Sequence, residues 1–137
     1  MKKHWLIVLL VLVGTPCISQ DLPDLGDSSR AVLSAAQEKN LGESIIRQLR
    51  KSPSYIHDPH LRDYLNELGY RLIVNSSSPG GDYRFFAIDA SSVNAFALPG
   101  GFIGVHTGLI LAVQNESELA SVLAHEIAHV TQRHIAR

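Results

Sequence analysis

Apolar residues recur at helical spacing in two stretches of the first half of the chain. In the first stretch, Ser34 is followed three residues later by Gln37, which is the arrangement of a capping box, and a helix is predicted over about residues 35–51. In the second stretch, Asp58 stands directly before a proline, a combination typical of a helix start. The apolar stripe that follows predicts a second amphipathic helix, which reaches about Val74.

Three short runs rich in β-branched and aromatic residues come next, and each predicts a strand. They are separated by small polar residues or by glycines, and they cover residues 83–89, 93–98 and 102–107. We expect a small antiparallel three-stranded sheet, in which Gly100 and Gly101 close the hairpin between the last two strands.

The last part of the chain has a helical pattern again. A brief apolar run at 109–113 predicts a helical turn, and Asn115 with Glu118 three residues later makes another capping pattern. A long helix is therefore predicted from near Glu116 to the end of the chain. The expected fold class is α+β, with two amphipathic helices, the small sheet and this final helix.

The first nineteen residues have the layout of a signal peptide. Two lysines precede an apolar run at 5–13, and small or turn-forming residues follow. This run is shorter than the about 20 residues needed to cross a bilayer as a helix. We therefore predict an export signal over 1–19 rather than a permanent anchor, and a mature chain without a transmembrane span. A lead-in over 20–33 and one domain over 34–137 complete the expected organisation.

Composition and charge narrow the class of protein further. The 137 residues are 45% hydrophobic and 18% charged, which is ordinary for one globular domain with a real core. The formal net charge is −1, and no cluster or stripe of Lys and Arg stands out. Because nucleic-acid binding needs such a basic surface, we expect no nucleic-acid partner.

The predicted final helix carries the chemistry. His125 and His129 are four residues apart, and four residues of α-helix turn by about 400°, so both imidazoles share one face and can hold one metal ion. Glu126 points about 100° away from His125, which suits a group that touches metal-bound water. The H-E-x-x-H pattern therefore predicts a zinc site in which Glu126 activates water for hydrolysis. The alternative is that the histidines lie on a helix and bind nothing.

Two histidines do not complete a catalytic zinc site. His134 lies nine residues beyond His125, and Gln132 stands where a metzincin would have a glycine, so we expect His134 on the opposite face of the helix. Asp82 or Asp89 could reach the ion, but nothing about their spacing recommends them. The remaining precedent is a His₂Glu site with a glutamate from a later helix. Three other histidines carry no pattern of their own and receive no function, namely His57, His60 and His106.

Three segments resemble a known family of zinc metallopeptidases. They are L-P-D-L-G at 22–26, V-N-A-F-A-L-P-G-G at 93–101 and S-E-L-A-S-V-L-A-H-E-I-A-H-V-T-Q-R-H at 117–134. The family is the gluzincin group that includes periplasmic proteases of β-barrel assembly and, more distantly, membrane-bound prenyl-protein and heat-shock metallopeptidases. The similarity runs through nearly all of the predicted mature chain.

The resemblance implies a role for each part of the motif. It implies that His125 and His129 are zinc ligands, that Glu126 is the general base, and that the third ligand is a glutamate on a helix downstream of Arg137. It also implies that an extended substrate pairs with the strand beside the cleft, which makes weak substrate-binding candidates of four residues, namely Asn94, Ala95, Phe96 and Ala97. The plainer alternative is that these four residues only form a hairpin strand.

The resemblance further implies a cellular role. It implies a zinc-dependent endopeptidase of the bacterial periplasm that acts in quality control and assembly of outer-membrane proteins. Its expected partners are unfolded or misassembled proteins and, through a helical repeat region further along the family's chains, the outer-membrane assembly machinery. Two alternatives stay open: a non-proteolytic zinc-binding chaperone or interaction module, and an inactive fragment of a metallopeptidase domain.

Overall fold

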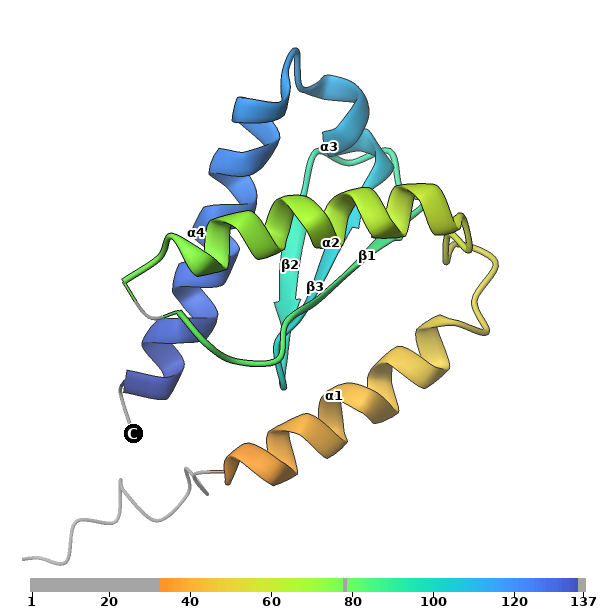
Figure 1. Ribbon diagram of the computed structural model, residues 1–137. Coiled ribbons are helices and arrows are strands. Elements are labelled where there is room, and N and C mark those ends of the chain that lie inside the picture. Colours follow the sequence, from red (N-terminus) through yellow and green to blue (C-terminus); the bar gives the residue numbers. More distant parts are fainter. Residues whose placement is uncertain (1–32, 78, 136–137) are drawn as a thin grey trace, which may run out of the picture. The chain divides into compact units, whose positions relative to one another are not determined.

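The computed structural model describes residues 33–77 and 79–135, with side chains as far as Gln132 (Figure 1). The predicted signal peptide and nearly all of the predicted lead-in lie outside the described residues. Within them, the elements are α1 (Ala35–Leu49), α2 (Pro59–Val74), β1 (Arg84–Ile88), β2 (Ala95–Leu98), β3 (Phe102–His106), α3 (Thr107–Ala112) and α4 (Glu116–Ile135). The α+β class is thereby confirmed. No helix in the described part is long and apolar enough to cross a membrane.

The helices begin where the capping residues predict. The Ser34 hydroxyl accepts a hydrogen bond from the Gln37 backbone N–H at 3.2 Å, and the Gln37 side chain accepts one from the Ser34 N–H at 2.8 Å. The Asp58 carboxylate accepts from the N–H of His60 at 2.8 Å, directly before α2. These bonds satisfy backbone donors that the first turn of a helix leaves without partners. Both predicted helix starts are therefore confirmed.

The sheet is mixed, and here the prediction of an antiparallel sheet is wrong for one pair of strands. Its order is β1-β3-β2. The hairpin of β2 and β3 is antiparallel as predicted, and its turn contains Gly100 and Gly101 at φ +81° and +85°, a backbone conformation that favours glycine. However, β3 inserts between β2 and β1 and runs parallel to β1, with Arg84 opposite Phe102. This order leaves β2 as an edge strand of the described sheet.

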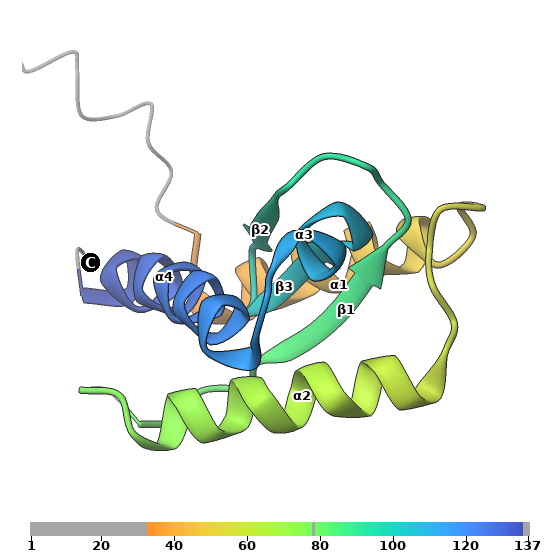
Figure 2. The same cartoon turned by 90° about the horizontal axis from the view of Figure 1, so that it is seen from above.

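Both faces of the sheet are covered by helices. On one face, Phe85 and Ala87 of β1 and Ile103 of β3 join a core cluster with residues of α2 and α4. On the other face, Phe86 and Phe102 pack with Ile46 of α1. Figure 2 shows α2 and α1 on opposite sides of the strands. Two-sided burial explains why β1 and β3 read as continuous apolar runs instead of alternating ones.

A polar network joins α2 to the first turn of α4. The Tyr64 hydroxyl donates to one carboxylate oxygen of Glu116 at 3.0 Å, and the Arg71 guanidinium donates to the other at 2.9 Å. These hydrogen bonds, from Tyr64 first and Arg71 second, lower the pKa of Glu116 below its ordinary value of 4.5. Partial burial, and then the bond to Glu116, raises the pKa of Tyr64 above its ordinary value of 10.0. The network is therefore intact across the neutral range.

Removing the Tyr64 hydroxyl should destabilise the fold in a pH-dependent way. We expect Tyr64→Phe to lower the free energy of unfolding most between pH 4.5 and 10.0, the ordinary pKa values of the two groups. The loss should shrink as pH falls through the lowered pKa of Glu116, because a protonated carboxyl is a weaker acceptor. It should also shrink as pH rises through the raised pKa of Tyr64, because a phenolate cannot donate. Urea unfolding of both proteins across this range measures the effect, and a difference that is independent of pH would contradict it.

Candidate active site

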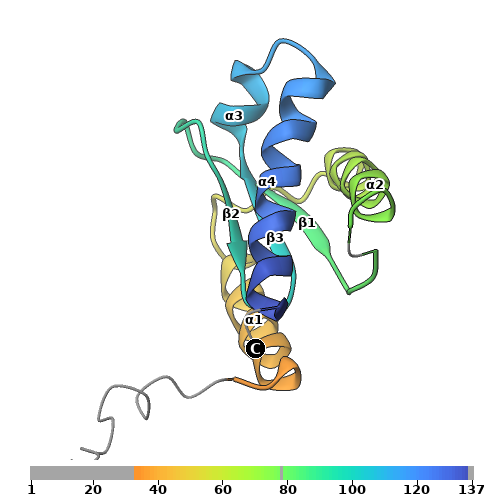
Figure 3. The ribbon, with the colours of Figure 1, turned by 90° about the vertical axis from the view of Figure 1, so that its left-hand side faces the viewer.

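The helix α4 has a buried side and an exposed side. The buried side carries apolar residues at intervals of three or four, namely Leu119, Leu123, Ile127 and Val130. They pack into the core, and α4 lies alongside β2 (Figure 3). The exposed side carries Ala124, His125, Ala128 and His129. Because residues four apart return to nearly the same face, burial of one set places both histidines on the open face.

The start of α4 is set by a cap. The side chain of Asn115 accepts a hydrogen bond from the Glu118 backbone N–H at 3.0 Å, and the Glu118 carboxylate accepts one from the Gln114 N–H at 2.8 Å. The capping pattern of Asn115 and Glu118 is therefore real, although the return bond goes to Gln114. This cap and the buried stripe together fix which residues of α4 face outward.

The two histidines of the motif converge on one point. Their Nε2 atoms lie 2.8 Å apart, and their ring centroids lie 4.3 Å apart with the rings nearly perpendicular. Both side chains are exposed, so a solvated ion can reach them. Zinc binds imidazole nitrogen at about 2.0–2.1 Å in tetrahedral geometry, so two nitrogens on one ion lie about 3.3 Å apart, within a small side-chain adjustment of this separation. Thus the residues present fit a shared metal ion.

Glu126 lies at the boundary between the two sides of α4. It is half-buried, with the exposed His125 before it and the buried Ile127 after it. A carboxylate in this position is held by the helix and still reaches solvent. It therefore lies next to the converging imidazoles without being one of the pair.

The edge strand β2 has an outer side along which no other described strand pairs with its backbone. The N–H of His106 donates to the carbonyl of Asn94 at 3.0 Å, so the bonds to β3 fall on Asn94 and then on every second residue. The alternation directs the N–H and C=O of Ala95 and Ala97 away from β3, toward the side where the described sheet has no further strand. The four candidate residues thus fall into two pairs by the direction of their backbone groups. Ala95 and Ala97 offer their backbone to a partner, whereas Asn94 and Phe96 use theirs within the hairpin.

Comparison with known proteins decides the family. The family model described as Peptidase family M48 matches residues 59–137, from the first residue of α2 to the end of the chain. This chain belongs to peptidase family M48. The matched region of this M48 chain contains the whole sheet, α4 and the H-E-x-x-H motif.

Curated relatives of this M48 chain are similar over most of its length. The β-barrel assembly-enhancing protease of Yersinia pestis is 49% identical over 120 residues, which cover 87% of this chain and 25% of the relative. The protein of the same name from Escherichia coli K12 is 48% identical over 116 residues, which cover 85% of this chain and 24% of the relative. The chain therefore spans about a quarter of the length of these relatives.

The described side chains of the M48 chain bring two histidines together but no third candidate ligand. Among them, no group of three His, Cys, Asp or Glu residues is placed to hold one ion. Asp82 is engaged elsewhere: its carboxylate pairs with the Lys39 ammonium at 3.1 Å, and this hydrogen bond lowers the pKa of Asp82. Asp89 accepts from the Thr107 hydroxyl at 3.3 Å. The side chain of His134 lies outside the described part. Neither aspartate therefore adds a ligand.

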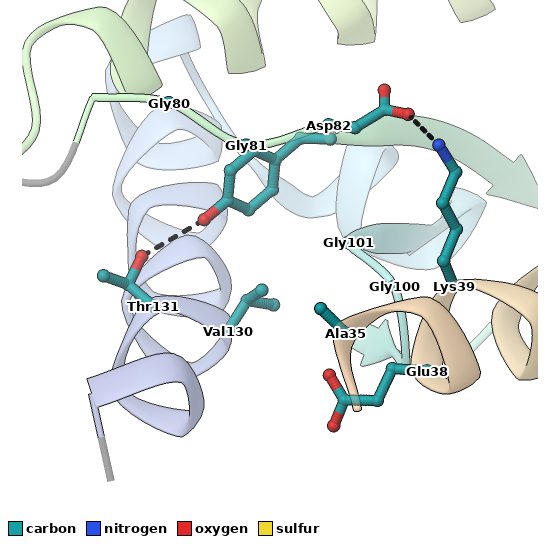
Figure 4. Close-up of a pocket in the computed structure, with 11 residues that line it drawn as sticks. Ala35, Glu38, Lys39, Gly80, Gly81, Asp82, Gly100, Gly101, Val130 and Thr131 are labelled. Carbon is teal, nitrogen blue, oxygen red and sulfur yellow. Dashed lines mark hydrogen bonds and ion pairs between the residues drawn. The ribbon is translucent and has the colours of Figure 1, made fainter. Parts of the chain in front are cut away.

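A cavity of about 440 Å³ lies next to the last described turns of α4. Val130 and Thr131 line it from α4 (Figure 4), and the Thr131 hydroxyl is 3.2 Å from that of Tyr83. The ion pair of Lys39 and Asp82 lies across the cavity from them. None of the motif residues is among the described residues that line it. The cavity is thus a separate feature from the histidine face.

One histidine without a sequence pattern has a defined role in the structure. The ring Nδ1 of His106 lies 2.7 Å from the hydroxyl oxygen of Ser92, in the loop that leads into β2. The residues are 14 positions apart, and no periodicity or motif connects them. This contact of His106 therefore follows only from the tertiary structure. By contrast, His60 is exposed at the start of α2.

Proposed function

We propose that this protein is a zinc-dependent endopeptidase. His125 and His129 hold the zinc ion together with a third ligand from outside the described side chains, and Glu126 is the general base. The observation that carries the proposal is the convergence of the two Nε2 atoms to 2.8 Å on the exposed face of α4. Membership in peptidase family M48 supports it, because the motif lies inside the matched region.

The groups of this chain divide the work of peptide hydrolysis between them. When bound, zinc would act as a Lewis acid, which lowers the pKa of water and polarises the scissile carbonyl. The Glu126 carboxylate accepts a proton from the attacking water while the water oxygen bonds to the carbonyl carbon. The carbon–nitrogen bond then breaks, and the same proton passes from Glu126 to the leaving amine. Glu126 returns to its starting form, as a general acid–base catalyst must.

The outer edge of β2, which no other described strand covers, is the proposed binding site for the substrate backbone. An extended peptide can add to an exposed strand through main-chain hydrogen bonds, which act on any sequence. Here the partners are the N–H and C=O groups of Ala95 and Ala97. Because α4 packs alongside β2, a peptide on this edge runs beside the helix that carries the motif. In this arrangement β2 positions the backbone of the substrate, and α4 supplies the catalytic groups.

The names of the relatives suggest where the enzyme works. They are called β-barrel assembly-enhancing proteases. We propose that the substrates are unfolded or misassembled outer-membrane proteins in the periplasm, which the protein reaches through the export signal over 1–19. Association with the outer-membrane assembly machinery is proposed from the same similarity. An edge strand that binds unpaired backbone suits such substrates, because an unassembled β-barrel protein exposes strand edges.

Replacing one ligand tests the metal site. We expect His129→Ala to weaken zinc binding of the full-length protein by about 100-fold or more, because a ligand is lost outright. Titration with a competing zinc chelator measures the affinity, and elemental analysis measures the content. The matched control is His60→Ala, which removes another exposed histidine and should leave zinc unchanged. Equal zinc affinity in both variants would show that His129 is not a ligand.

A proline scan tests the substrate edge. Ala97→Pro removes an N–H that points away from β3, so the sheet should stay intact while KM for dye-labelled casein rises by about tenfold. The control is Phe96→Pro, which removes an N–H of the β2–β3 ladder and should instead lower the melting temperature. If Ala97→Pro leaves KM unchanged, the substrate does not use this edge.

The non-proteolytic alternative rests on the two-ligand set in the described residues. It predicts an interaction module whose cellular function does not depend on Glu126. Complementation by Glu126→Gln of a strain that lacks the protein separates the two functions. The endopeptidase predicts loss of complementation, and the interaction module predicts full complementation.

A further inference from the structure

The loop 89–94, which connects β1 to β2, is held by His106 at the end of β3 and by the first residues of α3. His106 holds it twice near β2. Its backbone N–H donates to the carbonyl of Asn94 at 3.0 Å, and its ring Nδ1 lies 2.7 Å from the Ser92 hydroxyl oxygen. These contacts fall on the residues that directly precede β2. Therefore one residue of the central strand contacts the loop at two points just before the edge strand begins.

The other end of the same loop is also tied down. The Thr107 hydroxyl accepts from the N–H of Ala90 at 3.1 Å, and the N–H of Gly108 donates to the carbonyl of Ala90 at 2.8 Å. A Cβ on Gly108 would overlap the carbonyl oxygen of Ser91, so the close approach requires glycine. This end of the loop is thus held by residues 107 and 108, whereas near β2 the side-chain contact is the one between His106 and Ser92.

The ring of His106 lies on the opposite face of the sheet from α4. It packs edge-on against Phe96, with centroids 5.6 Å apart and an interplanar angle of 72°. Phe96 packs with the cluster on the α1 side, whereas Ala95 belongs to the cluster that includes the buried residues of α4. His106 is thus separated from the histidines of α4 by the sheet itself. Its direct contacts with the substrate side of the molecule are those with Phe96 and Asn94, at the beginning of β2.

We infer that His106 is a positioning residue for the substrate strand, a role that rests on the proposed function. Its bond to Ser92 and its contact with Phe96 hold the beginning of β2, and thereby the outward N–H and C=O groups of Ala95 and Ala97. A peptide that pairs with these groups depends on their register relative to α4. Loss of the contact between His106 and Ser92 loosens the outer edge of β2 and leaves the reacting groups on α4 in place.

This role predicts a particular split of kinetic constants in the full-length protein. With dye-labelled casein as substrate, His106→Ala should raise KM about fivefold, the size of effect expected for one lost hydrogen bond, and change kcat less than twofold. Ser92→Ala should do the same, and the double variant should be no worse than either single one. His106→Asn should restore KM, because its amide occupies nearly the position of Nδ1. The control His60→Ala should leave KM and kcat unchanged.

Several outcomes would overturn the inference. They are a fall in kcat at constant KM, a KM for His106→Ala equal to that of His60→Ala, and fully additive effects of the two alanine variants. A binding measurement separates this failure from failure of the proposed function. In the Glu126→Gln background, fluorescence anisotropy of dye-labelled casein reports the dissociation constant without hydrolysis. We expect His106→Ala to raise it about fivefold there too. An unchanged constant refutes the positioning role, whereas hydrolysis by Glu126→Gln itself refutes the proposed mechanism.

Discussion

Glu126→Gln is expected to reduce kcat by about 10²–10⁴-fold and to leave the zinc content unchanged. Glutamine keeps the size and polarity of the side chain at this half-buried position of α4, so the helix and the histidine pair stay in place. It cannot accept the proton that the attacking water must lose. The effect should therefore appear in the chemical step, with KM nearly constant. Cleavage of dye-labelled casein, measured together with elemental zinc analysis, tests both parts of this expectation.

A matched control distinguishes the general base from other carboxylates. Glu67→Gln changes an exposed glutamate of α2 in the same way and should retain wild-type kcat. If Glu126→Gln loses zinc as well as activity, the residue holds the site together instead of moving a proton. If it keeps full activity, the proposed mechanism is wrong. Each result thus assigns a different role to Glu126.

Leu123→Ala is expected to lower the free energy of unfolding by about 2–5 kcal/mol, the usual cost of emptying a fully buried leucine site. Leu123 is 0% exposed and lies on the buried side of α4, in one cluster with Leu65 of α2 and Ile103 of β3. Its loss should weaken the docking of the helix that carries His125 two residues later. Urea unfolding monitored by circular dichroism measures the change in stability.

An exposed leucine provides the comparison. Leu111 on α3 is 84% exposed, and Leu111→Ala should change the free energy of unfolding by no more than about 0.5 kcal/mol. The contrast between the two leucines tests whether α4 is docked as described. A cost below about 1 kcal/mol for Leu123→Ala would mean that the site collapses around the change or that α4 does not depend on this core.

Features that depend on neighbours within one helical turn followed from the sequence. Ser34 with Gln37, and Asp58 before Pro59, begin helices as predicted, because a cap needs only a side chain and a backbone N–H two or three residues away. The convergence of His125 and His129 followed in the same way from their spacing of four residues. The local half of the candidate site is therefore determined by the sequence alone.

Features that depend on contacts between distant segments were decided by the tertiary structure. Runs rich in β-branched and aromatic residues predicted the three strands but not their order, and the insertion of β3 between β1 and β2 did not follow from them. That order makes β2 an edge strand and turns Ala95 and Ala97 outward. It also brings His106 to Ser92, 14 residues before it. Strand pairing depends on which distant segments pack together around a common core, and the residue types within one short run carry no information about that choice.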